Sequence, residues 1–183
     1  MCDSGGYGAI PSRIEGTDVL VTPANHMAHL LLHCEPHDAA PIAKHLGLSF
    51  PDEPLSAGRA RGWAALHLAP DEWLLIGPQE EADAMTEAFE EAAVQWPHSL
   101  VDISDRSLAY DVEGGGAERL LASGCPLDLA PASFPVDRCT RTVLGKAMVM
   151  IWRTGTQRFR LEVARSFAPY VVKLLSTAAR ERD

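Results

Sequence analysis

Apolar residues recur along the chain with two different spacings, and each spacing predicts one kind of secondary structure. At residues 158–163, Phe159, Leu161 and Val163 alternate with charged residues, which predicts a half-exposed strand because successive strand side chains point to opposite faces. Elsewhere apolar residues are spaced by three and four, as on one side of an α-helix. The clearest case predicts a helix at about 79–95, with apolar residues at Ala82, Met85, Phe89, Ala92 and Trp96.

The predicted elements follow one order twice: a strand, a short helix, a two-stranded hairpin and a longer helix. The first set is a strand at 27–34, a helix that Asp38 caps and that ends before Gly47, a hairpin of 63–68 and 72–76, and the helix at 79–95. The second set is a strand region at 100–112, a helix at 114–124, a hairpin of 141–152 and 158–163, and a last helix that Ser166 caps. Stretches rich in proline, at 49–58 and 125–135, are expected to be loops.

This repeated order predicts the fold class. One unit alone leaves a sheet face bare, whereas two units can cover each other and close a core. We therefore expect an α+β protein whose two strand–helix–hairpin–helix units, at about 26–97 and 98–183, form a mostly antiparallel sheet with about four helices packed on it. The direction of pairing between the halves stays open. Because its start is glycine-rich, the segment 1–25 is expected to be a flexible tail.

Composition excludes some classes of partner. The formal charge of the 183 residues is −9, which argues against nucleic acid, and no apolar run approaches the length that crosses a membrane. Cys2, Cys34, Cys125 and Cys139 are scattered and no secretory signal precedes them, so reduced thiols in the cytoplasm are expected.

Charge is also unevenly distributed. Residues 71–91 hold eight acids and no Lys or Arg, whereas residues 138–182 hold ten Lys or Arg and two acids. Two interpretations stay open: solvated faces of helices and strands, or a surface that docks another protein by complementary charge.

The histidines are the strongest candidates for a metal site. His26, His29, His33 and His37 are spaced by three and four, beside Cys34 and Glu35. On a helix these imidazoles would share one face, and imidazole is a common ligand of zinc, copper and nickel. However, Pro23 and Pro36 disfavour a helix here, and along a strand the side chains are too far apart to bind one ion. Half-exposed strand histidines are the expected alternative.

Three further patterns could carry chemistry, each with a simpler explanation beside it. Cys139 lies between Arg138 and Arg141, which would lower the pKa of a thiol, but it is equally a small core side chain. The run Gly114–Gly116 could bind phosphate at a helix start, yet it lacks the Lys and Ser/Thr of a P-loop and is explained by a turn. The carboxylates of one strand region could act as acids or bases, although Asp105-Arg106 equally suggests a local ion pair or a turn: Asp102, Asp105 and Asp111. The tryptophans are expected in the core rather than around a cofactor: Trp73, Trp96 and Trp152.

Several longer phrases, taken together, identify a family. They occur in order between about Leu30 and Ala179: PDEWLL from Pro70, VDISDR from Val101, GCPLDL from Gly124, FP at Phe134, CTRT from Cys139, GKA from Gly145, and RSFAPY from Arg165. Because it carries these phrases in this order, the chain resembles the gamma subunit family of heterotetrameric sarcosine oxidase. More distantly it is similar to the tetrahydrofolate-binding fold of the glycine-cleavage aminomethyltransferase.

The resemblance implies an accessory chain of a four-chain complex. Such a complex, with alpha, beta and delta subunits as partners, oxidatively demethylates sarcosine to glycine, releases hydrogen peroxide and passes one carbon to tetrahydrofolate. FAD, FMN and NAD are expected on the partner subunits, with no cofactor, metal or catalytic residue on this chain. In the folate-binding relative an acidic residue precedes the strand that matches Met148–Trp152. Lys146 and Ala147 stand there instead, so folate chemistry is not expected to carry over.

Three hypotheses therefore remain before the structure is considered. The leading one is a non-catalytic subunit that buries partner surface through its basic last third and through Leu127, Leu129 and Phe134. The second is a stand-alone tetrahydrofolate-binding protein or one-carbon transferase. The third is a metal-binding protein that uses His29 and His33.

Overall fold

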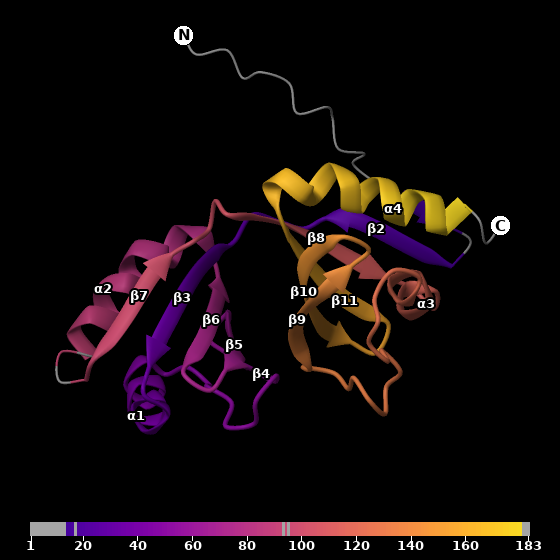
Figure 1. Cartoon of the computed structure of the whole chain (residues 1–183). Coiled ribbons are helices and arrows are strands. Elements are labelled where there is room, and N and C mark those ends of the chain that lie inside the picture. The colour runs from indigo at the N-terminus through magenta and orange to yellow at the C-terminus, as the bar shows by residue number, and fades with distance from the viewer. Residues whose placement is uncertain (1–13, 17, 93, 95, 181–183) are drawn as a thin grey trace, which may run out of the picture. The chain divides into compact units, whose positions relative to one another are not determined.

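The computed structural model describes residues 14–16, 18–92, 94 and 96–180, and it divides the chain into two compact units (Figure 1). Unit 2 comprises residues 25–106 and 137–140, and unit 1 comprises the rest. Each unit contains an antiparallel sheet and two α-helices. The predicted α+β class with four helices is confirmed, and each unit has its own sheet.

Unit 2 is a five-stranded sheet with two helices. Its elements are, in order, β3 (Ala28–Cys34), α1 (Pro36–Leu46), β4 (Ala57–Ala60), β5 (Trp63–Ala69), β6 (Glu72–Gly77), α2 (Ala82–Ala92) and β7 (His98–Asp102). The strand order is β4-β5-β6-β3-β7. Both helices pack on one face of this sheet, where Leu32 and Trp73 meet Ile42 of α1 and Phe89 of α2.

Unit 1 is a six-stranded sheet with two helices on one face. Its elements are β1 (Ile14–Gly16), β2 (Val19–Pro23), β8 (Ser107–Glu113), α3 (Ala117–Ala122), β9 (Cys139–Leu144), β10 (Ala147–Gly155), β11 (Arg158–Ala164) and α4 (Ala168–Arg180). The first two residues of β9 belong to unit 2. The strand order is β1-β2-β8-β11-β10-β9. Leu120 and Leu121 of α3, and Val171 and Leu175 of α4, share the core of the sheet.

The two units repeat one topology, as the sequence pattern predicts. In each sheet three strands that are consecutive in sequence lie side by side, β4-β5-β6 and β9-β10-β11. Read from these strands outward, the order β4-β5-β6-β3-β7 matches β9-β10-β11-β8-β2 position for position. The last strand of each order has a different origin in the sequence. In unit 2 the strand beside β3 is β7, which follows the long helix of its unit, whereas in unit 1 the strand beside β8 is β2, which comes from the N-terminal part of the chain. Unit 1 therefore needs the segment that precedes unit 2 in order to complete its sheet.

The positions of β2 and β7 in the two sheets correct two expectations about the domains. Residues 14–16 form β1 and residues 19–23 form β2, although a flexible tail was expected for 1–25; residues 1–13 and 17 of that tail lie outside the described residues. The unit boundary falls after Arg106 rather than at 97, because β7 pairs with β3. Alternating Val19 and Val21 bury one side of β2, which is what orders this segment.

Several element ends also differ from expectation. The helix α1 begins at Pro36, with Glu35 rather than Asp38 at its N-cap, because proline suits the first helical position. Ser166 is not a cap but the middle of a 3-10 turn before α4. The expected long strand at 100–112 is interrupted by a turn at 103–106, and Gly145, with a φ of 61°, splits the strand expected at 141–152. The loop expected at 49–58 includes the start of β4.

Candidate functional site

The four histidines do not converge in the structure. His29 and His33 lie on β3, where His29 is buried with its Nδ1 2.9 Å from the carbonyl oxygen of Met27. The half-exposed His33 lies 3.8 Å from Glu72, and the exposed His37 lies on α1 beside Asp38. Among the described residues no group of three His, Cys, Asp or Glu side chains could hold a metal ion. The strand geometry expected from Pro23 and Pro36 explains this separation.

The candidate nucleophile is buried. Cys139 is 0% exposed, and burial raises the pKa of its thiol to about 12, although the nearby Arg138 acts in the opposite direction. Its Sγ lies 3.4 Å from the carbonyl oxygen of Ser56. The sequence suggested activation by arginine, but burial is the larger effect. The Cys139 side chain is thus a small core residue and not a reactive thiol.

The glycine run is occupied by a carboxylate of the same chain. The Asp18 side chain lies against Gly115 and Gly116, and it pairs with Arg119 of α3 at 2.5 Å. The amide of Gly116 donates to the backbone carbonyl of Asp18 at 3.1 Å. The amides of Gly114 and Gly116 donate to backbone carbonyls and the Asp18 carboxylate lies against the run, so the run forms a turn into α3, the simpler of the two explanations.

The three aspartates also lie apart. The Asp102 carboxylate accepts hydrogen bonds from the hydroxyl and amide of Ser104, at 2.5 and 2.8 Å, and these lower its pKa. Asp111 lies opposite Arg160 in the β8–β11 pairing, and burial raises its pKa. Asp105 lies in the turn between β7 and β8. The contacts of Asp102 stabilise the turn after β7, and Asp111 lies in the pair of strands β8 and β11. The three carboxylates therefore form no shared site.

Arg153 organises the loop that follows α3, and the sequence analysis missed it. Its guanidinium is 3% exposed and donates to the carbonyl oxygens of Leu129, Phe134 and Thr156 at 2.8 to 2.9 Å. It also lies 4.7 Å from the centre of the Phe159 ring. Because these partners are backbone atoms, no motif marks the arginine; an isolated Arg in an otherwise apolar strand is the one available signal.

This anchoring corrects the predicted contact residues of the loop. Leu129 and Phe134 are 2% and 5% exposed and belong to the core of unit 1, so they cannot contact a partner. Leu127 is partly buried against the same core. The loop surface consists instead of residues such as Pro131 and Val136, and Val136 is 47% exposed.

The basic last third of the chain separates into a buried and an exposed set. Arg153 and Arg160 are buried, and Arg160 pairs with Glu162 at 2.8 Å. Other basic side chains are exposed along α4, and they follow two exposed aromatic ones, Phe167 in the 3-10 turn before α4 and Tyr170 in its first turn. This surface, which we call the α4 face, consists of Phe167, Tyr170, Lys173, Thr177 and Arg180.

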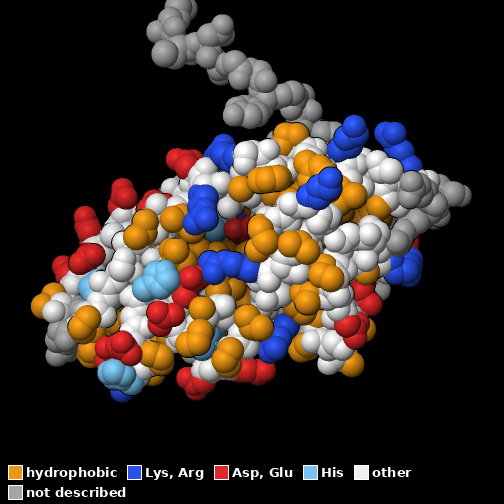
Figure 2. Space-filling view, in the orientation of Figure 1, with side chains coloured by type: hydrophobic (Ala, Val, Ile, Leu, Met, Phe, Trp, Pro, Cys, Tyr) orange, Lys and Arg blue, Asp and Glu red, His pale blue; other side chains and the backbone are white. Residues whose placement is uncertain are grey.

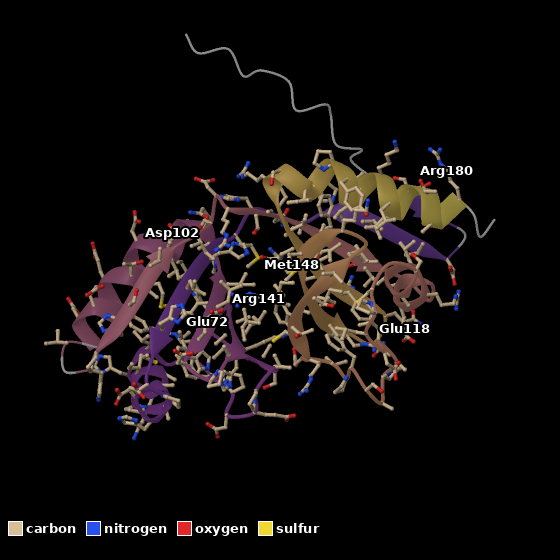
Figure 3. All side chains as sticks on the ribbon, in the orientation of Figure 1. Glu72, Asp102, Glu118, Arg141, Met148 and Arg180 are labelled. Atoms are coloured by element: carbon tan, nitrogen blue, oxygen red, sulfur yellow. The ribbon has the colours of Figure 1, made fainter. Side chains whose placement is uncertain are left out.

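The α4 face has the composition of a protein-binding surface. Phe167 and Tyr170 are 46% and 37% exposed, and no acidic residue occurs between 163 and 180. Figure 2 shows Lys and Arg side chains interspersed with hydrophobic ones over the region of α4, and Figure 3 shows Arg180 projecting from the end of this helix. Aromatic residues and arginine are enriched in interfaces. The Tyr170 hydroxyl accepts from the Lys146 amide at 3.1 Å, which holds the ring in place.

The turn before β10 carries no acidic residue. Lys146 lies in the exposed turn between β9 and β10, and Ala147 is 0% exposed in the core of unit 1. A carboxylate at 147 would be buried among apolar side chains, at a high desolvation cost.

The family model of the sarcosine oxidase gamma subunit matches residues 33–181. The gamma subunit from Corynebacterium sp. (strain U-96) is 37% identical over 125 residues, which are 68% of this chain and 60% of that protein. The gamma subunit from Arthrobacter sp. is 33% identical over 143 residues, which are 78% of this chain and 70% of that protein. The matched residues thus span 60% of the length of the first relative and 70% of the second.

Two solved structures show the same fold. A chain of the heterotetrameric sarcosine oxidase from Corynebacterium sp. U-96 superposes with a TM-score of 0.82 at 29% identity, covering 93% of this chain and 88% of that one. Aminomethyltransferase T of the Bartonella henselae glycine cleavage system gives 0.67 at 14% identity, over 92% of this chain and half of that one. The second likeness shows the fold alone. Together these matches show that the chain belongs to the sarcosine oxidase gamma subunit family.

Proposed function

We propose that the chain is the non-catalytic gamma subunit of a heterotetrameric complex that oxidatively demethylates sarcosine to glycine. The observation that carries this proposal is the match of residues 33–181 to the gamma family, together with the TM-score of 0.82 to a chain of such a complex. In this proposal the hydrogen peroxide and the one-carbon transfer to tetrahydrofolate arise at the alpha and beta subunits. FAD, FMN and NAD reside there too.

The chain's own groups support an accessory role. Cys139 is buried and the Asp18 carboxylate occupies the glycine turn, so the residues that might react or bind a phosphate are already committed to the fold. What the chain offers a partner is surface, above all the α4 face. The unpaired cysteines Cys34, Cys125 and Cys139 suit the reducing cytoplasm, which we propose as the location. No helix in the described ranges has the length and apolar character to span a membrane.

Co-expression with the large subunits tests the proposal. The chain should co-purify with the flavin-containing subunits in a single complex, and omission of the chain should lower the yield and thermal stability of that complex. Assembly with full activity and stability in its absence would show that the role is wrong.

A second candidate is a stand-alone tetrahydrofolate-binding protein, which the likeness to aminomethyltransferase T favours. Titration calorimetry of the isolated chain with tetrahydrofolate separates the two. Micromolar binding would favour this candidate, whereas the burial of Ala147 leads us to expect none.

A further inference from the structure

Unit 2 contains a groove that is separate from the α4 face. It has a volume of about 430 Å³, within the range of binding pockets, and it is bordered by the end of α1, the turn before β5 and one side of α2. Its lining residues are His45, Leu46, Arg61, Trp63, Glu81, Ala84, Met85, Ala88 and Glu91. Apolar side chains make the floor, and charged ones stand at the rim.

The groove is built by the period of α2. Residues 81, 84, 85, 88 and 91 are spaced by three and four, so they share one side of the helix, while Ala82 and Phe89 point into the core. Over ten residues this side extends about 15 Å. The groove therefore has the length of about three helical turns.

Its floor is held rigidly. The Trp63 ring is 3% exposed, and its Nε1 donates to Glu81 at 2.9 Å. The ring lies against Gly77, where any side chain would overlap it. On the opposite wall, the Arg61 guanidinium donates to the carbonyl oxygen of Leu46 at 3.1 Å and covers the end of α1. A preformed floor lowers the entropy that binding must overcome.

The unit that carries the groove is strongly acidic. Its residues 25–106 and 137–140 include fifteen Asp or Glu and five Lys or Arg, a formal charge of −10, whereas the rest of the chain has a formal charge of +1. Six of these acids lie from Glu80 to Glu91, in the 3-10 turn before α2 and along α2 itself, and Figure 2 shows Asp and Glu side chains gathered over that side of the unit. Such a field selects a basic partner and steers its approach.

We propose that this groove binds a helical segment of another subunit, with an apolar ridge that fills the floor and Lys or Arg residues that pair with Glu81 and Glu91. The inference rests on the proposed membership of a complex and adds the chemistry of one contact. A helix fits because the groove is lined by side chains along a helix and not by an open strand edge, which is the arrangement of helix-in-groove recognition. The α4 face, which is basic and aromatic, requires a partner surface of the opposite charge.

Cross-linking within the assembled complex tests the occupant. The photoreactive p-benzoylphenylalanine replaces Ala84, which is exposed at the groove, and the complex is irradiated after co-expression. Mass spectrometry should find the cross-link in a partner segment with apolar residues at helical spacing and flanking Lys or Arg. A cross-link to an acidic or aperiodic segment, or none at all, would overturn the proposal.

A matched pair of charge reversals gives a second readout. Glu91→Lys, at the groove, should weaken binding of the chain to the remaining subunits at least tenfold, measured by titration. Glu87→Lys, on the same helix but not lining the groove, should change it less than twofold. If the two variants lose the same binding affinity, the proposal that a partner binds in the groove is wrong. If the unaltered chain does not enter a complex, the proposed function itself fails, so the two failures are distinguishable.

Discussion

Burial decides the chemistry of the cysteines. It raises the thiol pKa of Cys139 to about 12 and that of Cys34 to about 11, so both stay protonated near neutral pH, and a protonated thiol is a poor nucleophile. In a Cys2→Ser variant we expect the remaining thiols to react with Ellman's reagent at pH 8 at least a hundredfold more slowly in the folded chain than in urea. Rapid labelling of Cys139 in the folded chain, located by peptide mapping, would show that burial does not protect it.

Arg153 should contribute more to stability than any exposed arginine of unit 1. Arg153→Met removes the donors to the buried carbonyl oxygens of Leu129 and Phe134 and to the partly buried one of Thr156, and each unsatisfied buried polar group costs about 1–3 kcal/mol. We expect the free energy of unfolding to fall by about 3 kcal/mol or more in urea denaturation. The control is Arg158→Met, because the exposed pair of Arg158 with Glu113 contributes about 0–1 kcal/mol. Similar losses in the two variants would contradict this assignment.

These residues show where inference from sequence ends at this scale. Neighbours along the chain, Arg138 and Arg141, suggested a reactive Cys139, because sequence shows proximity but not burial. Arg153 gave no signal because its partners are backbone oxygens, and two of them, those of Leu129 and Phe134, are 24 and 19 residues away in the sequence. The separation of the histidines, in contrast, followed from Pro23 and Pro36 alone, because proline acts on the local backbone.

At the scale of elements, the turn between β8 and α3 depends on one glycine. Gly114 has a φ of 113°, and a side chain there would overlap the backbone carbonyl of Asp18. Gly115 has room, with its nearest neighbours at 3.6 Å or more. Gly114→Ala should therefore lower the free energy of unfolding by about 2–3 kcal/mol, and Gly115→Ala by less than about 1 kcal/mol. Urea denaturation measures both free energies of unfolding. If the two substitutions lower them equally, the backbone conformation of Gly114 is not the cause of the loss.

The α4 face should act through charge and aromatic surface together. In the co-expressed complex, Lys173→Glu should weaken binding of the chain several-fold, and the loss should diminish at high salt, because exposed charges are screened. Phe167→Ala should weaken binding without such a dependence on salt. Lys44→Glu, an equal charge change on exposed α1 of unit 2, serves as the control. If the Lys44 variant loses as much affinity as the Lys173 variant, net charge and not the α4 face governs binding.

Elements with a clear period were predictable, whereas their ends and edges were not. The period of 3.6 residues located α2 and α4, and alternation located β11. The edge strand β4 was missed because its sequence, Ala-Gly-Arg-Ala, has no apolar alternation. A turn at Asp105-Arg106 was one of two alternatives, but it was not seen to divide the expected strand at 100–112. In sequence Asp102 and Ser104 resemble strand residues, and only the structure shows that they bond to each other.

For the whole molecule, the repeat could be read from element order, but the exchange of an N-terminal strand could not. In the sheets β2 pairs with β8, and β7 pairs with β3. The order of elements along the chain does not show which strands pair, so this arrangement could not be predicted from it. Consequently the expected boundary at 97 is too early, and unit 1 includes segments from both ends of the chain. Unit 2 lies between these segments, so loss of residues 14–23 would affect unit 1 directly.

Separate cores lead to a prediction about cooperativity. The core with Leu161 lies within unit 1 and the core with Leu32 lies within unit 2, and both side chains are 0% exposed. Leu→Ala at such positions costs about 2–5 kcal/mol through the cavity it leaves. We expect Leu161→Ala to accelerate amide hydrogen exchange mainly in β8, β10 and β11, and Leu32→Ala mainly in β3, β5 and β6, since local opening follows cooperative units.

Each variant serves as the control of the other, because residue type and burial are the same. Exchange followed by mass spectrometry at a denaturant concentration where both variants remain folded gives the opening free energy of each strand. A loss confined to the mutated unit means that the units open independently, and a partner that binds the α4 face would then stabilise unit 1 alone. An equal loss in both units from either substitution would show that the chain opens as one body and would contradict the separation of the cores.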